Sequence, residues 1–273
     1  MTKSNHMQKI FYYIINLIIA AGIFSCAKID NYAEPGETLK GTVVDAATGE
    51  PVLTDQGSEG TRVRMRELSW KASAPENLDF FCMKEGLFQN TKVFKGNYNV
   101  RVDGAFIPIV RLSTDGDTLA DESKTLDING VTEVEFKVQP FLTLKWEGAP
   151  TVENGKITAT VIVTRGVSPE DFKAKVEPMG NYSDDFLNIT DVRLFVSQGP
   201  FVGYREWDNR YSTIIDYPGD SFNASLGHPI TITTQGTIPP GRTVFIRAAA
   251  RINYATENIR RHNYNEALRV DLP

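Results

Sequence analysis

Cysteine is scarce in this chain, which contains only Cys26 and Cys82. An exported protein that relied on disulfides would carry an even set of cysteines within its folded part. The apolar neighbours Phe81 and Met83 indicate that Cys82 is a small buried hydrophobic residue and not a reactive thiol. We therefore expect the hydrophobic core, without any disulfide, to stabilise the folded region.

Histidine and concentrated positive charge are also lacking. Only three histidines are present, and the two beyond the N-terminal segment, His228 and His262, do not stand in a zinc-binding spacing such as HExxH. The 34 acidic residues outnumber the 29 basic residues, for a net charge of −5, and no large basic block follows the N-terminal segment. This balance argues against a nucleic-acid partner, whose phosphates require clustered lysine and arginine.

Sequence motifs of catalysis are absent as well. The chain has no GxSxG motif, and Cys82 lacks the signature of a catalytic nucleophile. A glycosidase needs only two well-placed carboxylates, which composition alone does not exclude, but two small β-sandwiches offer no obvious deep catalytic cleft. We therefore expect a protein that is not an enzyme and that has neither a cofactor nor a metal site.

The N-terminal segment contains one apolar run, residues 10–24, which follows Lys9 and leads through small residues into Cys26. This order of basic, apolar and small residues is typical of a secretory signal peptide, and Met7 could be its true start. A transmembrane helix is the alternative, but the run is shorter than the roughly 20 residues that a span needs, and no stop-transfer cluster follows it. The pattern thus predicts a signal peptide over residues 1–25.

The residues that end this segment, Ile23-Phe24-Ser25-Cys26, resemble a lipobox, although Phe24 is bulkier than the usual residue at its position. The resemblance implies a thioether-linked diacylglycerol and an acylated amine on Cys26. Each buried methylene contributes about 0.8 kcal/mol, so three acyl chains would make release from a membrane negligible. Residues 26–37 lack an apolar period and contain turn-forming residues, which indicates a flexible lipidated tether.

Beyond the tether, apolar and polar residues alternate with period two, as in half-buried β-strands. The remaining length is sufficient for two domains, and Pro140 marks a boundary between them. Ser168 as N-cap and Pro169 as the first helical residue predict one brief helix. The predicted strands are 39–45, 62–68, 91–94, 97–102 and 133–138 in the first domain, and 142–146, 157–163, 189–196, 243–251 and 267–272 in the second. We therefore predict an all-β fold of two consecutive β-sandwich domains, residues 38–139 and 140–273, the second immunoglobulin- or fibronectin-like.

The first predicted domain carries a resemblance at the level of fold. Residues Gly41–Asp45 with Thr48–Pro51, followed by Gly96–Val100, resemble a carboxypeptidase-regulatory or transthyretin-like β-sandwich. Domains of that kind are binding or spacer modules rather than enzymes. The resemblance therefore implies a non-catalytic first domain.

A narrower resemblance is carried by Asp30–Tyr32, Gly60–Arg62 and Gly86–Lys92, which are similar to segments of a family of Bacteroidetes lipoproteins of unknown function. Members of that family are commonly encoded beside starch-utilisation-type outer-membrane pairs, each a porin-like transporter with its glycan-binding lipoprotein. The resemblance implies an accessory lipoprotein of glycan acquisition, anchored in the outer membrane at the cell surface, with oligosaccharide, the transporter and its lipoprotein as partners. A structural or assembly role in the transporter complex and a role as an adhesin are the alternatives.

One segment, residues 203–211, combines aromatic residues with carboxylate, amide and guanidinium groups. An aromatic ring can stack on the C–H face of a sugar while such polar groups bind its hydroxyls. In β-sandwiches, however, tryptophan and tyrosine most often pack in the core, which is the alternative interpretation. The candidate ligand-binding residues are Tyr204, Arg205, Trp207, Asp208, Tyr211 and Tyr217. Among these, we expect Tyr204, Trp207 and Tyr211 to form part of an exposed sugar platform.

A second polar segment, from Asp115 to Glu122, offers carboxylate oxygens of the kind that calcium binds. It lacks the twelve-residue spacing of an EF-hand loop and its closing glutamate. We therefore expect a solvated acidic loop here.

Overall fold

The computed structural model describes residues 34–69 and 75–273, so the signal peptide, the lipidation site Cys26 and most of the tether lie outside the described residues. Strand accounts for 48% and helix for 10% of the described residues. The predicted all-β fold class is therefore confirmed. Residues 35–273 form one compact unit, which contains several separate sheets.

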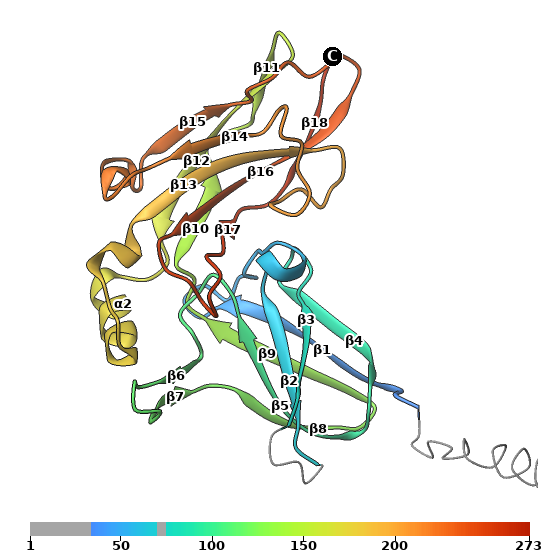
Figure 1. Cartoon of the computed structure of the whole chain (residues 1–273). Helices are drawn as coiled ribbons and strands as arrows, with labels where there is room; N and C mark the ends of the chain where they lie inside the picture. Colours follow the sequence, from blue (N-terminus) through green and yellow to red (C-terminus); the bar gives the residue numbers. More distant parts are fainter. Residues whose placement is uncertain (1–33, 70–74) are drawn as a thin grey trace, which may run out of the picture. The chain divides into compact units, whose positions relative to one another are not determined.

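The first two sheets enclose one hydrophobic core (Figure 1). In the three-stranded sheet, β1 (Glu37–Asp45) lies between the antiparallel β4 (Leu87–Val93) and the parallel β9 (Val131–Val138). The four-stranded sheet has the order β3 (Asn77–Phe81), β2 (Arg62–Glu67), β5 (Gly96–Asp103) and β8 (Lys124–Ile128), and β6 (Val110–Leu112) pairs with β7 (Thr118–Asp121) in a separate hairpin. Alternate strand residues such as Val43, Val100 and Phe136 fill the core, and Cys82 is buried among them, as predicted.

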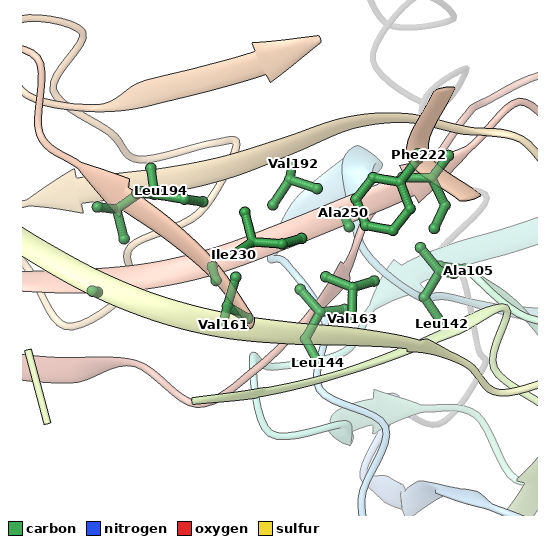
Figure 2. Close-up of a cluster of buried hydrophobic side chains, with 14 of the residues drawn as sticks. Ala105, Leu142, Leu144, Val161, Val163, Val192, Leu194, Phe222, Ile230 and Ala250 are labelled. Carbon is green, nitrogen blue, oxygen red and sulfur yellow. The ribbon is translucent and has the colours of Figure 1, made fainter. Parts of the chain in front are cut away.

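The later sheets enclose a second and larger core. One sheet consists of β10 (Leu142–Trp146) and β11 (Thr151–Glu153), which pair with β12 (Lys156–Arg165), and of β15 (Pro229–Thr233), which also pairs with β12. The other has the order β14 (Thr213–Asp216), β13 (Ile189–Ser197) and β16 (Thr243–Ile252), with β17 (Asn263–Tyr264) and β18 (Leu268–Asp271) both paired to β16. Figure 2 shows side chains of both sheets in this core, among them Val161, Val163, Val192 and Leu194.

In residues 34–69 and 75–273, helical structure is limited to short elements. The helix α2 (Pro169–Val176) begins as predicted, because the Ser168 hydroxyl accepts a hydrogen bond from the Asp171 N–H at 3.0 Å. The 3₁₀ helices are η1 (Gly57–Glu59), η2 (Glu177–Met179), η3 (Asp184–Leu187) and η4 (Ser221–Ser225). Among residues 34–69 and 75–273, no helix is both long and apolar enough to cross a membrane.

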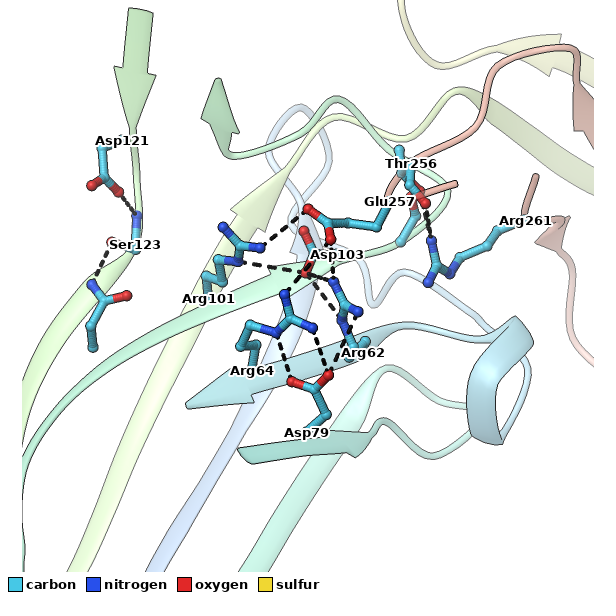
Figure 3. A network of polar contacts seen from close by, with 12 residues as sticks. Arg62, Arg64, Asp79, Arg101, Asp103, Asp121, Ser123, Thr256, Glu257 and Arg261 are labelled. Atoms are coloured by element: carbon cyan, nitrogen blue, oxygen red, sulfur yellow. Dashed lines mark hydrogen bonds and ion pairs between the residues drawn. The ribbon is translucent and has the colours of Figure 1, made fainter. Parts of the chain in front are cut away.

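A charged network joins the four-stranded sheet of β3, β2, β5 and β8 to the turn between β16 and β17. Glu257, in that turn, forms ion pairs with Arg62 at 3.0 Å and with Arg101 at 3.2 Å (Figure 3). Both arginines also pair with Asp103. Glu257 has a φ of 51°, a left-handed conformation that is unfavourable for a residue with a Cβ atom. This conformation places the Glu257 carboxylate among the arginines, and the resulting ion pairs offset the conformational cost.

A second connection runs through Arg247 of β16, whose side chain is almost completely buried. Its guanidinium donates to the carbonyl oxygen of Thr54 at 2.9 Å and to that of Asn265 at 2.7 Å, and it lies over the Tyr264 ring at 4.4 Å. β16 of the second set is thus in direct polar contact with the loop between β1 and β2, although the chain passes from one set of sheets to the other near Pro140. The division into domains 38–139 and 140–273 stays a prediction.

Candidate functional site

The β13–β14 loop, residues 198–212, folds back over the outer face of its own sheet. Alternation along β13 explains this path, because Val192 and Leu194 enter the large core while Phe195 points to the opposite face. There, Phe195 packs with Val202 of the loop and with residues of β16 and β17, and Trp207 packs against the same cluster. An apolar residue on the outer face therefore requires a covering segment, and the loop supplies it.

Backbone and hydroxyl hydrogen bonds fix the loop on β13. The Asp208 N–H donates to the Val196 carbonyl at 2.7 Å, and the Val196 N–H donates to the Ser212 hydroxyl at 2.9 Å. Within the loop, Gly203 and Glu206 exchange two backbone hydrogen bonds of 3.1 and 3.2 Å, which close a tight turn directly before Trp207. The position of the indole ring is thus set by the strand beneath it.

Trp207 lies at an open depression of about 300 Å³ on this surface. The indole is half-buried, and its ring meets Phe195 edge to face at a centroid distance of 5.7 Å. Hydroxyl, amide and carboxylate groups surround it, and the lining residues are Ser197, Gln198, Glu206, Trp207, Asp208 and Asn209. The arrangement combines one aromatic ring with hydrogen-bonding groups, the combination that a polyhydroxylated ligand requires.

The two carboxylates of the depression are held in defined positions. Glu206 accepts a hydrogen bond from the Ser197 hydroxyl at 2.9 Å. Asp208 forms a bidentate ion pair with Arg210, with contacts of 2.6 and 3.0 Å, and this hydrogen bonding lowers the pKa of Asp208 below its usual value. Asp208 is therefore ionised at neutral pH, and it can accept hydrogen bonds from hydroxyl groups.

The structure brings only Trp207 and Asp208 of the predicted site residues into the depression. Tyr204 is partly exposed on the same loop, but it stacks on His262 at 5.6 Å and lies beneath the guanidinium of Arg193. The side chain of Arg205 is exposed, and its backbone N–H donates to Asp55 at 3.0 Å.

The remaining two predicted residues lie elsewhere on the second set of sheets. Tyr211 and Tyr217 are half-buried and pack against the large core, where Tyr217 meets Phe222 at 4.7 Å. They do not line the Trp207 depression. The six residues as a ligand-binding set therefore stay a prediction. Sequence reasoning missed Ser197, which ends β13, and Gln198, which begins the loop, because their approach to Trp207 depends on the return of the loop.

Beneath Tyr204 lies a buried charged cluster that the sequence did not reveal. Asp191 accepts hydrogen bonds from Arg193 at 2.5 Å, from Arg251 at 2.6 Å and from His262 Nε2 at 3.1 Å. Burial alone would raise the pKa of Asp191, but hydrogen bonds from His262 and Arg193, with the positive charge of Arg193, outweigh burial and lower it. Burial lowers the pKa of His262. The cluster supports the loop from inside, because Tyr204 packs on His262 and Arg193.

The acidic segment 115–122 lies on the exposed β6–β7 hairpin. The Ser113 hydroxyl accepts the backbone N–H groups of Asp115 and Asp117 and shapes the turn. In the part of the chain that the structure describes, no group of three or more His, Cys, Asp or Glu side chains is placed to hold a metal ion.

Comparisons with known proteins identify relatives among solved structures. No protein-family model and no curated protein matches the chain. A DUF3823 family protein from Bacteroides uniformis is 55% identical, with a TM-score of 0.85, over 88% of this chain and 100% of its own.

Two more distant structures share the fold. A candidate carbohydrate-binding protein from Bacteroides uniformis is 18% identical, with a TM-score of 0.61, over 87% of this chain and 100% of its own. A DUF3823 family protein from Parabacteroides merdae is 15% identical, with a TM-score of 0.56, over 88% of this chain and 100% of its own. None of the three is described as an enzyme. On the strength of the 55% identity along nearly its whole length, the chain belongs to the DUF3823 family.

Proposed function

We propose that this protein is a non-catalytic carbohydrate-binding lipoprotein that assists glycan acquisition at the cell surface. The observation that carries the proposal is the half-buried indole of Trp207 at an open depression rimmed by hydroxyl, amide and carboxylate groups. The fold shared with a candidate carbohydrate-binding protein supports the same ligand class. An open depression suits a segment of a polysaccharide chain, which can pass over the ring without being enclosed.

The strength expected of such a site is modest. Stacking on an aromatic ring contributes about 0.5–1.5 kcal/mol beyond burial of area, and a millimolar complex amounts to only about 4 kcal/mol in total. Trp207 therefore supplies a large share of the affinity. Native electrophoresis through gels that contain single polysaccharides tests this, because one polysaccharide should retard the protein and should retard the Trp207→Ala variant much less. Unretarded migration through every glycan gel would refute the carbohydrate assignment.

The anchor is a second part of the proposal. Acyl chains on Cys26, followed by the tether, would hold the protein at the outer membrane. Mass spectrometry of the mature protein should find the acyl chains on Cys26, and the Cys26→Ala variant should lose membrane association in detergent-free washing. A Cys26→Ala protein that stays in the membrane fraction after its signal peptide has been removed would contradict this mode of anchoring.

One surface feature favours an assembly role as the second candidate. The edge strands β3 and β4 and the turn between them expose apolar side chains, namely Leu78, Phe81, Met83 and Leu87. Exposed edges of this kind can pair with another protein. Co-purification with a porin-like transporter in detergent, combined with free migration in all glycan gels, would favour this candidate over carbohydrate binding.

A further inference from the structure

A hollow of about 330 Å³ lies away from Trp207, beside the connection between the two sets of sheets. Ile107, Ile109 and Val138 supply apolar surface, together with Ala46 and Ala47 of the turn after β1. The polar lining residues are Arg111, Glu122, Lys137, Gln139 and Lys175. None of these residues lines the Trp207 depression, so the hollow is a separate candidate site. Its volume lies at the lower end of the range of small-molecule sites, about 300–1,000 Å³.

The charge of the lining is positive, because three basic side chains face one acidic side chain. Arg111 is the central group, since its side chain is only 14% exposed. Its Nη1 donates to the Pro108 carbonyl at 2.9 Å, and the nearest carboxylate, Glu122, lies 4.0 Å away. A guanidinium has five N–H donors, and within the described residues this is the one hydrogen bond that the Arg111 side chain makes. The other donors are available to an anionic ligand.

The other cations are placed by different elements of the fold. Lys175 comes from α2, where its ammonium donates to Gln139 at 2.6 Å and lies 3.9 Å from Asp171. Lys137, at the end of β9, is well exposed and lies 3.8 Å from Glu135. Neither lysine is held by a close ion pair, so Lys137 can turn toward an anion, and the ammonium of Lys175 can add its charge while it donates to Gln139. Arg111 is suited to bidentate binding of a planar carboxylate, with the lysines as additional charges.

From this lining we infer that the hollow binds the carboxylate-bearing sugar of an acidic saccharide. Arg111 would bind the carboxylate, and the apolar floor of Ile107, Ile109 and Val138 would contact the C–H face of the ring. Glu122 and Gln139 would accept hydrogen bonds from hydroxyl groups. The hollow has no aromatic lining residue, so it lacks the stacking surface of a neutral-sugar site. The choice of a saccharide rests on the proposed function, whereas the anionic group follows from the hollow itself.

Titration calorimetry on the folded protein tests the inference with digalacturonate, neutral digalactose and the non-sugar acid cyclohexanecarboxylate at millimolar concentration. We expect only digalacturonate to bind, more weakly at high salt because the attraction is screened. Arg111→Gln should weaken binding about tenfold. Glu122→Gln keeps an acceptor for a sugar hydroxyl but removes the negative charge that repels the carboxylate, so it should strengthen binding about twofold. The exposed Lys124, outside the hollow, provides the control Lys124→Gln, which should bind like the unmodified protein.

The Glu122→Gln variant keeps the test informative if Arg111→Gln fails to fold. Absence of digalacturonate binding, or an affinity that both substitutions leave unchanged, would overturn the inference. Equal binding of digalactose or of cyclohexanecarboxylate would overturn it as well. Trp207→Ala should leave digalacturonate binding in the hollow unchanged. Free migration of the unmodified protein in every glycan gel, together with intact digalacturonate binding, would therefore refute the Trp207 site alone.

Discussion

His262 is buried beside Asp191 in a way that specifies its protonation state. Its Nε2 lies 3.1 Å from the Asp191 carboxylate, while its Nδ1 is buried without a hydrogen-bond partner among the described residues. A proton on Nδ1 would be a buried donor without an acceptor, which is costly. The neutral ring with its proton on Nε2 avoids that cost, in agreement with the lowering of the His262 pKa by burial.

This protonation state predicts that acid destabilises the protein. The pKa of His262 in the folded protein is lowered from 6.5, so below about pH 6.5 the unfolded chain binds a proton that the folded protein excludes. The free energy of unfolding is therefore unaffected by His262 above that pH, and it falls at lower pH by at most about 1.4 kcal/mol per pH unit. Asp191, whose folded pKa is also lowered, adds a further loss below about pH 4.

Melting temperatures between pH 7.5 and pH 5 test this prediction. The His262→Gln variant retains an N–H donor for Asp191 but does not titrate, so its melting temperature should fall less over this range than that of the unmodified protein. His228 is exposed, and His228→Gln should follow the unmodified protein. If the melting temperatures of His262→Gln and of the unmodified protein fell equally over this pH range, the assignment of a neutral His262 would be contradicted.

The burial of a single residue was predictable from sequence where its neighbours along the chain determine it. The burial of Cys82 followed from its apolar neighbours, and burial raises the pKa of its thiol to about 12, which makes it unreactive. The aromatic segment identified Trp207, but the orientation of Tyr211 and Tyr217 toward the large core could not be predicted. In a strand, the alternation of apolar and polar residues shows which side chains face the core. The loop that carries Tyr211 has no such alternation.

At the scale of elements, the N-terminus of α2 was predictable because a capping serine followed by proline acts locally. The cap also yields a prediction, since Ser168→Ala removes the acceptor for the Asp171 N–H. We expect this substitution to lower the free energy of unfolding by about 1 kcal/mol. Ser168→Asp preserves an acceptor for the Asp171 N–H and should retain most of the free energy of unfolding that Ser168→Ala loses. Chemical denaturation measures both variants, and equal losses would show that the cap does not contribute.

Strands were predictable where alternation runs through several buried positions. β12, β13 and β16 pair on both edges, and all three were predicted within one or two residues at each end. β3, β6, β7, β8, β11, β14, β15 and β17 were not predicted, and β7 lies within the segment 115–122 that was expected to be a loop. Each of these is short, so that few residues carry the pattern, and most have only one neighbouring strand. β4 was predicted at 91–94 but spans Leu87–Val93, and it pairs with β1 from Leu87 to Val93.

At the scale of the whole molecule, the contacts between the two sets of sheets could not be predicted from sequence. Arg247 lies within the alternating pattern of β16, and nothing local indicates that its guanidinium reaches the carbonyl of Thr54. Asp55 shows the same difficulty, because its buried carboxylate accepts from the Arg205 N–H and the Tyr264 hydroxyl, more than a hundred residues away. Such contacts depend on tertiary structure.

The interface predicts that both cores unfold together. Arg247→Met replaces the guanidinium by an unbranched apolar side chain and leaves the carbonyls of Thr54 and Asn265 without this donor. We expect the substitution to lower the free energy of unfolding by about 3 kcal/mol. Scanning calorimetry should show a melting temperature lowered by roughly 5–10 °C. The exposed Arg242 gives the control Arg242→Met, with little expected change. Two separate transitions in the unmodified protein would show instead that the cores unfold independently.

The central claim is that the indole of Trp207 binds carbohydrate, and titration calorimetry with the polysaccharide that retards the protein tests it most directly. Trp207→Ala should weaken binding at least several-fold, and Trp207→Phe, which keeps a stacking ring, should weaken it less. The matched control is Trp146→Phe, because Trp146 packs against the large core and donates to the Glu266 carbonyl at 3.0 Å. We predict full affinity for Trp146→Phe. Equal affinity of Trp207→Ala and the unmodified protein would contradict the claim and assign Trp207 to packing alone.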